Sequence, residues 1–183
     1  MSQAFIKGVT EHLPQAGITF DKFHAGAIVN DAVDKVRRSE RKNRPELKNT
    51  RYIWLKNTLT GSQADTLDDL SHSNLKTARA YRIRLAFQDL YSQPSGENAE
   101  AYLKKWYFWA THSRLPPIIE AAKTVKRHWD GILRWFETTI ANGFMEAINS
   151  LVQAAKARGY RSTRNLKAII YLIAGKLEIQ LPT

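Results

Sequence analysis

Apolar residues recur at intervals of three and four along most of this 183-residue chain, and that spacing constrains the fold more than any other feature. After Gly26 the spacing is followed by Ile28, Ala32, Val33 and Val36, which predicts a helix with one buried face. Further helices are predicted over residues 4–13, 67–91, 98–113 and 118–138. The chain is therefore expected to be mostly α-helical.

One short segment departs from this spacing. Ile18, Thr19 and Phe20 form a brief run with β-branched residues after a Gly- and Pro-containing turn, which predicts one strand near residues 18–23. Asp21 follows the run, and His24 comes three positions later. Two interpretations are open. Either the pair belongs to a catalytic or metal site, or Asp21 caps a loop and His24 packs or titrates without a function.

The net charge of the chain indicates more about its function than its length does. The chain has 28 Lys and Arg against 17 Asp and Glu, a formal charge of +11, which favours a polyanionic partner, with nucleic acid first. The alternative is a basic soluble protein without such a partner. With no cysteine, the sequence excludes disulfides, thiolate zinc sites and thiol nucleophiles, and a cytoplasmic location is expected. No apolar run reaches the roughly 20 residues of a membrane span, so no membrane partner is expected.

Two clusters stand out in the first two thirds of the chain, one basic and one aromatic. The basic tract at residues 37–44 is expected to lie in solvent. Aromatic residues crowd residues 106–109 beside Lys104 and Lys105, where they could stack on bases, although most such aromatic side chains in helices form the core.

The last third predicts an amphipathic helix starting near Gly143, with Glu146 and Asn149 on its polar face. Glu146 would occupy the third helical position, where a carboxylate satisfies backbone N–H groups, and this accounts for it without any function. A basic cluster follows, and it is either a phosphate-contacting face or a solvated helix surface. Its members are Lys156, Arg158, Arg161, Arg164 and Lys167.

Two motifs, taken together, resemble a known family. The stretch MSQAFIKGVTEHLPQAGITFDKFH ends in a D-x-x-H element, Asp21 and His24. The stretch NGFMEAINSLVQAAKARGYRSTRNLKAIIYLIAGKL opens with N-G-x-x-E-x-x-N, which spans Asn142, Glu146 and Asn149. In this order they resemble the C-terminal part of the DDE domain of bacterial insertion-sequence transposases of the ISL-three family, from residue 1 to about residue 177.

The resemblance implies the C-terminal part of an RNase H-like fold that carries a helical insertion. Residues 1–24 would end the RNase H-like sheet, residues 25–138 would form the insertion, and residues 139–183 would hold the catalytic-glutamate helix and a basic tail helix. All three are expected to form one structural unit. Glu146 matches the third catalytic acid and would be a ligand of Mg²⁺, while Asp21, His24, Asn142 and Asn149 would support the site.

The implied function is DNA transposition by metal-dependent phosphoryl transfer, with DNA as partner. In the family, the two aspartates that complete the catalytic set lie before the position that Met1 occupies in this chain. We therefore expect this chain to bind Mg²⁺ only weakly and to be inactive alone. The alternative is a catalytically inactive, basic helical protein that binds DNA, a full-length transposase or itself.

Overall fold

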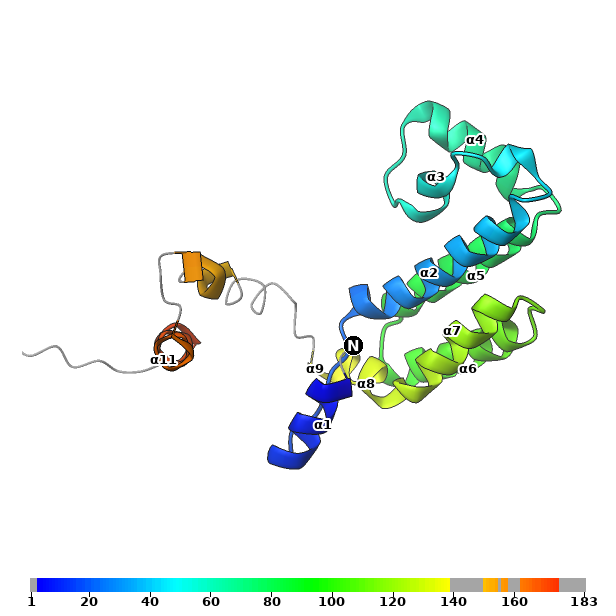
Figure 1. The fold of residues 1–183 in the computed structure, drawn as a ribbon. Coiled ribbons are helices and arrows are strands. Elements are labelled where there is room, and N and C mark those ends of the chain that lie inside the picture. The colour runs from blue at the N-terminus through cyan, green and yellow to red at the C-terminus, as the bar shows by residue number, and fades with distance from the viewer. Residues whose placement is uncertain (1–2, 139–149, 155, 158–161, 175–183) are drawn as a thin grey trace, which may run out of the picture. The chain divides into compact units, whose positions relative to one another are not determined.

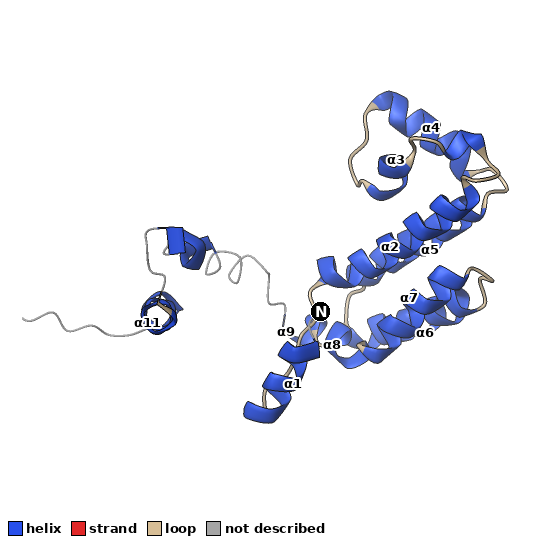
Figure 2. Cartoon of the chain, viewed as in Figure 1, coloured by secondary structure: helices blue, strands red, loops and turns tan. Residues whose placement is uncertain are grey.

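The computed structural model describes residues 3–138, 150–154, 156–157 and 162–174. The chain divides into two compact units, Met1–Thr138 and Thr139–Thr183. Figure 1 labels the helices, and Figure 2 shows only helices and loops in the described residues. The first unit contains α1 Gln3–His12, α2 Lys22–Glu40, α3 Arg51–Leu55, α4 Gly61–Ser71, α5 Lys76–Asp89, α6 Gly96–Thr111, α7 Pro116–Arg127, α8 Trp129–Leu133 and α9 Trp135–Thr138, with 3-10 turns at Pro45–Leu47 and Leu90–Ser92.

Four helices of the first unit form a bundle. Helix α2 packs on α5 and α7, and α6 packs on the same two helices, so the four close into a ring around one core. Figure 1 shows α2 and α5 running side by side, with α3 and α4 at one end of this pair. The predicted mostly helical fold is confirmed.

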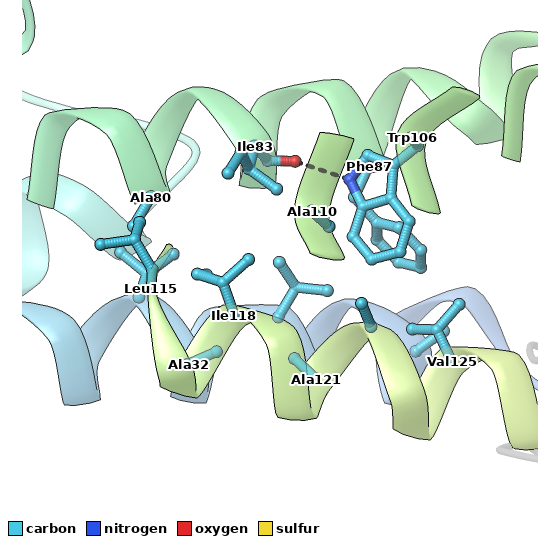
Figure 3. Close-up of a cluster of buried hydrophobic side chains, with 14 of the residues drawn as sticks. Ala32, Ala80, Ile83, Phe87, Trp106, Ala110, Leu115, Ile118, Ala121 and Val125 are labelled. Atoms are coloured by element: carbon cyan, nitrogen blue, oxygen red, sulfur yellow. Dashed lines mark hydrogen bonds between the residues drawn. The ribbon is translucent and has the colours of Figure 1, made fainter. Parts of the chain in front are cut away.

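The core of the bundle is made of apolar residues from all four helices. Figure 3 shows Ile83 and Phe87 of α5 facing Trp106 of α6 and Ile118 of α7, and all four side chains are buried. The Trp106 Nε1–H donates a hydrogen bond of 2.9 Å to the Ile83 carbonyl oxygen, so the indole is both buried and satisfied. The interval of three and four in the sequence therefore marks the buried faces.

The strand predicted near residues 18–23 is wrong. Residues 18–21 have no regular structure, and α2 begins at Lys22. A strand needs a ladder of hydrogen bonds to a neighbouring strand, and none exists among the described residues. The segment is held instead by Phe20, which is buried and donates its backbone N–H to the Gly131 carbonyl oxygen at 2.9 Å.

The two longest predicted helices are each broken. The helix expected over residues 67–91 ends at Ser71, before the turn-forming Ser73 and Asn74, and starts again at Lys76, where Glu40 supplies the N-terminal cap of α5. Its carboxylate accepts the backbone N–H groups of Lys76 and Thr77 at 2.8 and 2.7 Å. The helix expected over residues 118–138 is divided into α7, α8 and α9 at His128 and Arg134.

In the second unit, residues 150–154 and 156–157 are helical, and α11 spans Thr163–Ala174. No helix in the described part of the chain is long and apolar enough to cross a membrane.

Candidate functional site

Asp21 and His24 lie together at the start of α2. The His24 Nδ1 is 3.2 Å from the Asp21 Oδ2, and the side chains are 67% and 17% exposed respectively. Asp21 occupies the N-cap position, yet its side chain makes no capping hydrogen bond. Asp21 therefore contacts His24 instead of capping the helix through its side chain, and the exposed imidazole does not pack in the core, so the functional and the non-functional interpretation both stay open.

Phe20 fixes where the pair lies. Its ring contacts the His128 ring, with centroids 4.6 Å apart, and its backbone is tied to Gly131. An added Cβ at Gly131 would clash with the Phe20 ring, so this approach requires glycine. Burial, and then the charge of Arg127, lower the pKa of His128, which keeps that imidazole neutral against the Phe20 ring.

A groove of about 390 Å³ opens beside the pair, between α2, α3 and α5. Its lining includes Lys22, Phe23 and the buried Arg84. The Arg84 guanidinium donates to Asn30 Oδ1 at 2.6 Å and to Asn57 Oδ1 at 2.9 Å. Burial lowers the pKa of Arg84, but a guanidinium remains protonated in proteins, so the groove is positively charged.

Tyr91 also lines the groove. Its buried hydroxyl makes no hydrogen bond within the described part of the chain, and its ring stacks on Phe136 with centroids 6.2 Å apart. Burial, and then the charge of Asp21, raise the pKa of Tyr91, so the phenol is neutral and cannot act as a base near neutral pH. The groove thus combines the positive charges of Lys22 and Arg84 with a neutral phenol.

Other predicted site residues fall partly outside the described residues. Glu146, Asn142 and Asn149 lie outside them, and so do Arg158 and Arg161. Within the described residues, no three His, Asp or Glu side chains gather as a metal site would require.

The rest of the basic cluster is exposed. Lys156, Arg164 and Lys167 all have solvent-accessible side chains in helical segments of the second unit. A phosphate-contacting face and a solvated helix surface both require this exposure, so the two interpretations stay open.

The aromatic residues divide between core and surface. Trp106 and Trp129 are buried, as core packing predicts. Phe108 and Trp109, however, are 65% and 41% exposed on α6. Of the aromatic side chains at residues 106–109, these two are therefore the ones exposed enough to stack on bases.

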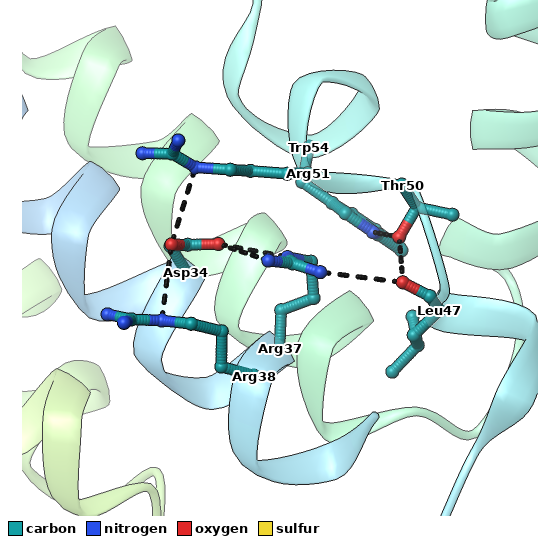
Figure 4. Close-up of polar contacts among 7 residues, drawn as sticks. All are labelled: Asp34, Arg37, Arg38, Leu47, Thr50, Arg51 and Trp54. Atoms are coloured by element: carbon teal, nitrogen blue, oxygen red, sulfur yellow. Dashed lines mark hydrogen bonds and ion pairs between the residues drawn. The ribbon is translucent and has the colours of Figure 1, made fainter. Parts of the chain in front are cut away.

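The expectation that the whole basic tract at residues 37–44 lies in solvent is wrong at Arg37. This guanidinium is buried and pairs with the buried Asp34, whose carboxylate also contacts Arg38 and Arg51 (Figure 4). On one helix, Asp34 precedes Arg37 by three positions and Arg38 by four, and this spacing allows the two ion pairs to be predicted from the sequence. The approach of Arg51 from α3 depends on the folded loop and has no local signal.

Comparison with known proteins gives one consistent result. A family model described as transposase matches residues 1–170. The chain is 28% identical over 170 residues to the transposase for insertion sequence element IS1001 of Bordetella parapertussis, covering 87% of this chain and 42% of that protein. It is 26% identical over 196 residues to the transposase for insertion sequence element IS1557 of Mycobacterium tuberculosis, covering 90% and 44%. The chain thus spans less than half the length of these relatives, and no solved structure matches it.

Proposed function

This chain belongs to the ISL-three family of DDE transposases, and we propose that it serves DNA transposition by contributing Glu146 as the third catalytic carboxylate. The observation that carries the proposal is the extent of the family match, because residues 1–170 include Asp21, His24 and Glu146. The matched relatives are transposases, which favours this function over a non-enzymatic basic protein.

Membership in a transposase family implies DNA as the partner, and the charge of the chain suits it. The formal +11 charge favours phosphate contacts through counterion release. We assign the basic cluster from Lys156 to Lys167 to the DNA backbone, because a transposase family implies DNA and the cluster concentrates positive charge in one short segment.

The Asp21–His24 pair is assigned a supporting role. The carboxylate next to Nδ1 favours the tautomer that carries hydrogen on that nitrogen, so Nε2 is left for a ligand. With Lys22 and Arg84 at the neighbouring groove, His24 stands where a phosphate of the DNA backbone would be attracted. The helices of residues 25–138 would then form an insertion between this pair and Glu146.

Divalent metal ions are implied by the family, with Mg²⁺ suited to carboxylate ligands. Such an ion, held in part by Glu146, would supply Lewis-acid activation of the attacking oxygen and charge stabilisation at the DNA phosphate. The described residues do not fit a metal site by themselves, since Asp21 has only His24 beside it. Glu146 would be the ligand that this chain supplies.

The test uses a transposase that contains this chain and is as long as the matched relatives. Its substrate is a donor plasmid that carries the ends of the insertion sequence. We expect Glu146→Gln to reduce excision to background, because the amide keeps the size of the carboxylate and removes its charge. Glu120→Gln is the matched control, since Glu120 is exposed on α7 and its ion pair in the described residues is with Lys123. Excision at the normal rate by the Glu146→Gln protein would refute the assignment.

A further inference from the structure

Four charged side chains, which we name the Asp34 cluster, meet where α2 faces α3. They are Asp34, Arg37, Arg38 and Arg51, and Figure 4 shows the three guanidinium groups around one carboxylate. Three cations against one anion leave an excess of positive charge at a site whose carboxylate is buried. One guanidinium is enough to neutralise one carboxylate.

Arg37 performs that structural role. Its Nε and one terminal nitrogen donate to the Asp34 Oδ1 at 2.9 and 2.7 Å, and both residues are buried. Its other terminal nitrogen donates to the Leu47 carbonyl oxygen at 3.4 Å, which holds the loop between α2 and α3. The loop is fixed further by Thr50, whose hydroxyl donates to the same carbonyl at 2.9 Å. Asp34 is therefore neutralised without help from Arg38 or Arg51.

Arg38 and Arg51 both approach the other oxygen, Asp34 Oδ2. Each does so through Nε, at 3.3 and 3.4 Å respectively, and each side chain is 55% exposed. Figure 4 shows their terminal nitrogens turned away from Asp34, on the side opposite Arg37. Within the described residues neither makes another ion pair. The carboxylate thus orients two guanidinium groups and leaves their terminal N–H donors for a ligand.

The turn that follows α2 adds positive charge. Arg41 and Lys42 are exposed there, three and four positions after Arg38, and neither forms an ion pair within the described part of the chain. Two nearby carboxylates have other contacts, since Glu40 caps α5 and Glu46 pairs with Arg44 at 3.2 Å. The end of α2 that carries Arg38 is consequently a region of unneutralised cations.

We propose that Arg38 and Arg51, positioned by Asp34, bind the phosphate backbone of duplex DNA, and that Arg41 and Lys42 extend this surface beyond the end of α2. Guanidinium groups match phosphate oxygens with paired N–H donors, and holding them in place beforehand reduces the entropy lost on binding. The choice of DNA as the polyanion rests on the proposed function. The surface shares no residue with the basic cluster of residues 156–167 or with the groove beside Asp21.

Fluorescence anisotropy of the whole chain with a labelled duplex, repeated over a range of salt concentrations, tests the surface. Arg38→Ala/Arg51→Ala should reduce the slope of log K against log salt by about 1.8, since each lost phosphate contact contributes about 0.9. The fold should survive, because Arg37 still neutralises Asp34. Thermal unfolding followed by circular dichroism checks this.

Two further variants separate charge from orientation. Lys7→Ala/Lys123→Ala removes the same charge from two exposed lysines that each pair with a glutamate, and its slope should stay close to that of the unchanged chain. Arg38→Lys/Arg51→Lys keeps the charge but loses the Nε contact to Asp34. It should keep the slope and lose affinity by about 10-fold, equivalent to one charge-assisted hydrogen bond.

Three results would overturn the inference: an unchanged slope in the double alanine variant, full affinity in the double lysine variant, or single-stranded RNA bound as tightly as duplex DNA. A melting temperature that falls while the slope stays constant would show that the Asp34 cluster only joins α3 to α2. None of these results bears on Glu146, whose excision assay tests the proposed function independently.

Discussion

At the scale of single residues, Gly131 decides whether the segment before Asp21 can reach the bundle. Phe20 is 5% exposed and lies directly against the Gly131 backbone, so a side chain at this position has no space. The carboxylate of Asp21 follows Phe20 in the chain, and its location therefore depends on a contact made more than a hundred residues away. Glycine is needed at position 131 for this close approach.

We expect Gly131→Ala to lower the free energy of unfolding by about 1–3 kcal/mol, because overpacking forces Phe20 or α8 to shift. Urea denaturation followed by circular dichroism measures the loss. Gly8→Ala is the matched control, since a Cβ at Gly8 of α1 meets nothing within 4 Å and alanine favours a helix. Equal stability of the two variants would mean that Phe20 does not occupy the position described.

At the scale of elements, the apolar spacing predicts where helices exist and fails where tertiary contacts end them. Helices α1 and α6 lie within two residues of the predicted ranges 4–13 and 98–113. The break between α4 and α5 has a local signal in the turn-forming residues Ser71, Ser73 and Asn74, which the apolar spacing alone overlooks. The cap of α5 has none, because it comes from a glutamate at position 40. The strand prediction is wrong for a similar reason. Its residues suit a strand, but pairing depends on a neighbour that local sequence does not reveal.

Glu40→Ala should destabilise the chain by about 1–2 kcal/mol, since it removes the acceptor for two backbone N–H groups at the start of α5. Urea denaturation gives the total effect, and faster amide exchange at Lys76 and Thr77 would locate it. Glu100→Ala is the control, because Glu100 forms an exposed ion pair with Lys104, and such pairs contribute little. Unchanged exchange at Thr77 would contradict the capping role.

At the scale of the whole molecule, the candidate site combines features that sequence reveals with features that only folding creates. The Asp21–His24 contact joins residues three apart and can be predicted from the sequence. The contacts of Asp34 with Arg51, and of Arg84 with Asn30, join separate helices and cannot. Glu146 lies outside the described residues, so its relation to Asp21 remains a prediction.

The first unit should fold without the second. The buried apolar core of the described residues runs from Phe20 to Ile132, so a fragment of residues 1–138 contains it entirely. We expect this fragment to unfold cooperatively, with a melting temperature within about 3 °C of the whole chain, the shift that roughly 1 kcal/mol produces at this size. Circular dichroism measures both. A fragment of residues 1–115, which lacks α7, should show no cooperative transition, because α7 closes the ring with α2 and α6. A melting temperature of residues 1–138 more than about 10 °C below that of the whole chain would contradict this expectation. It would show that the bundle needs residues 139–183 for its stability, although its buried core lies outside them.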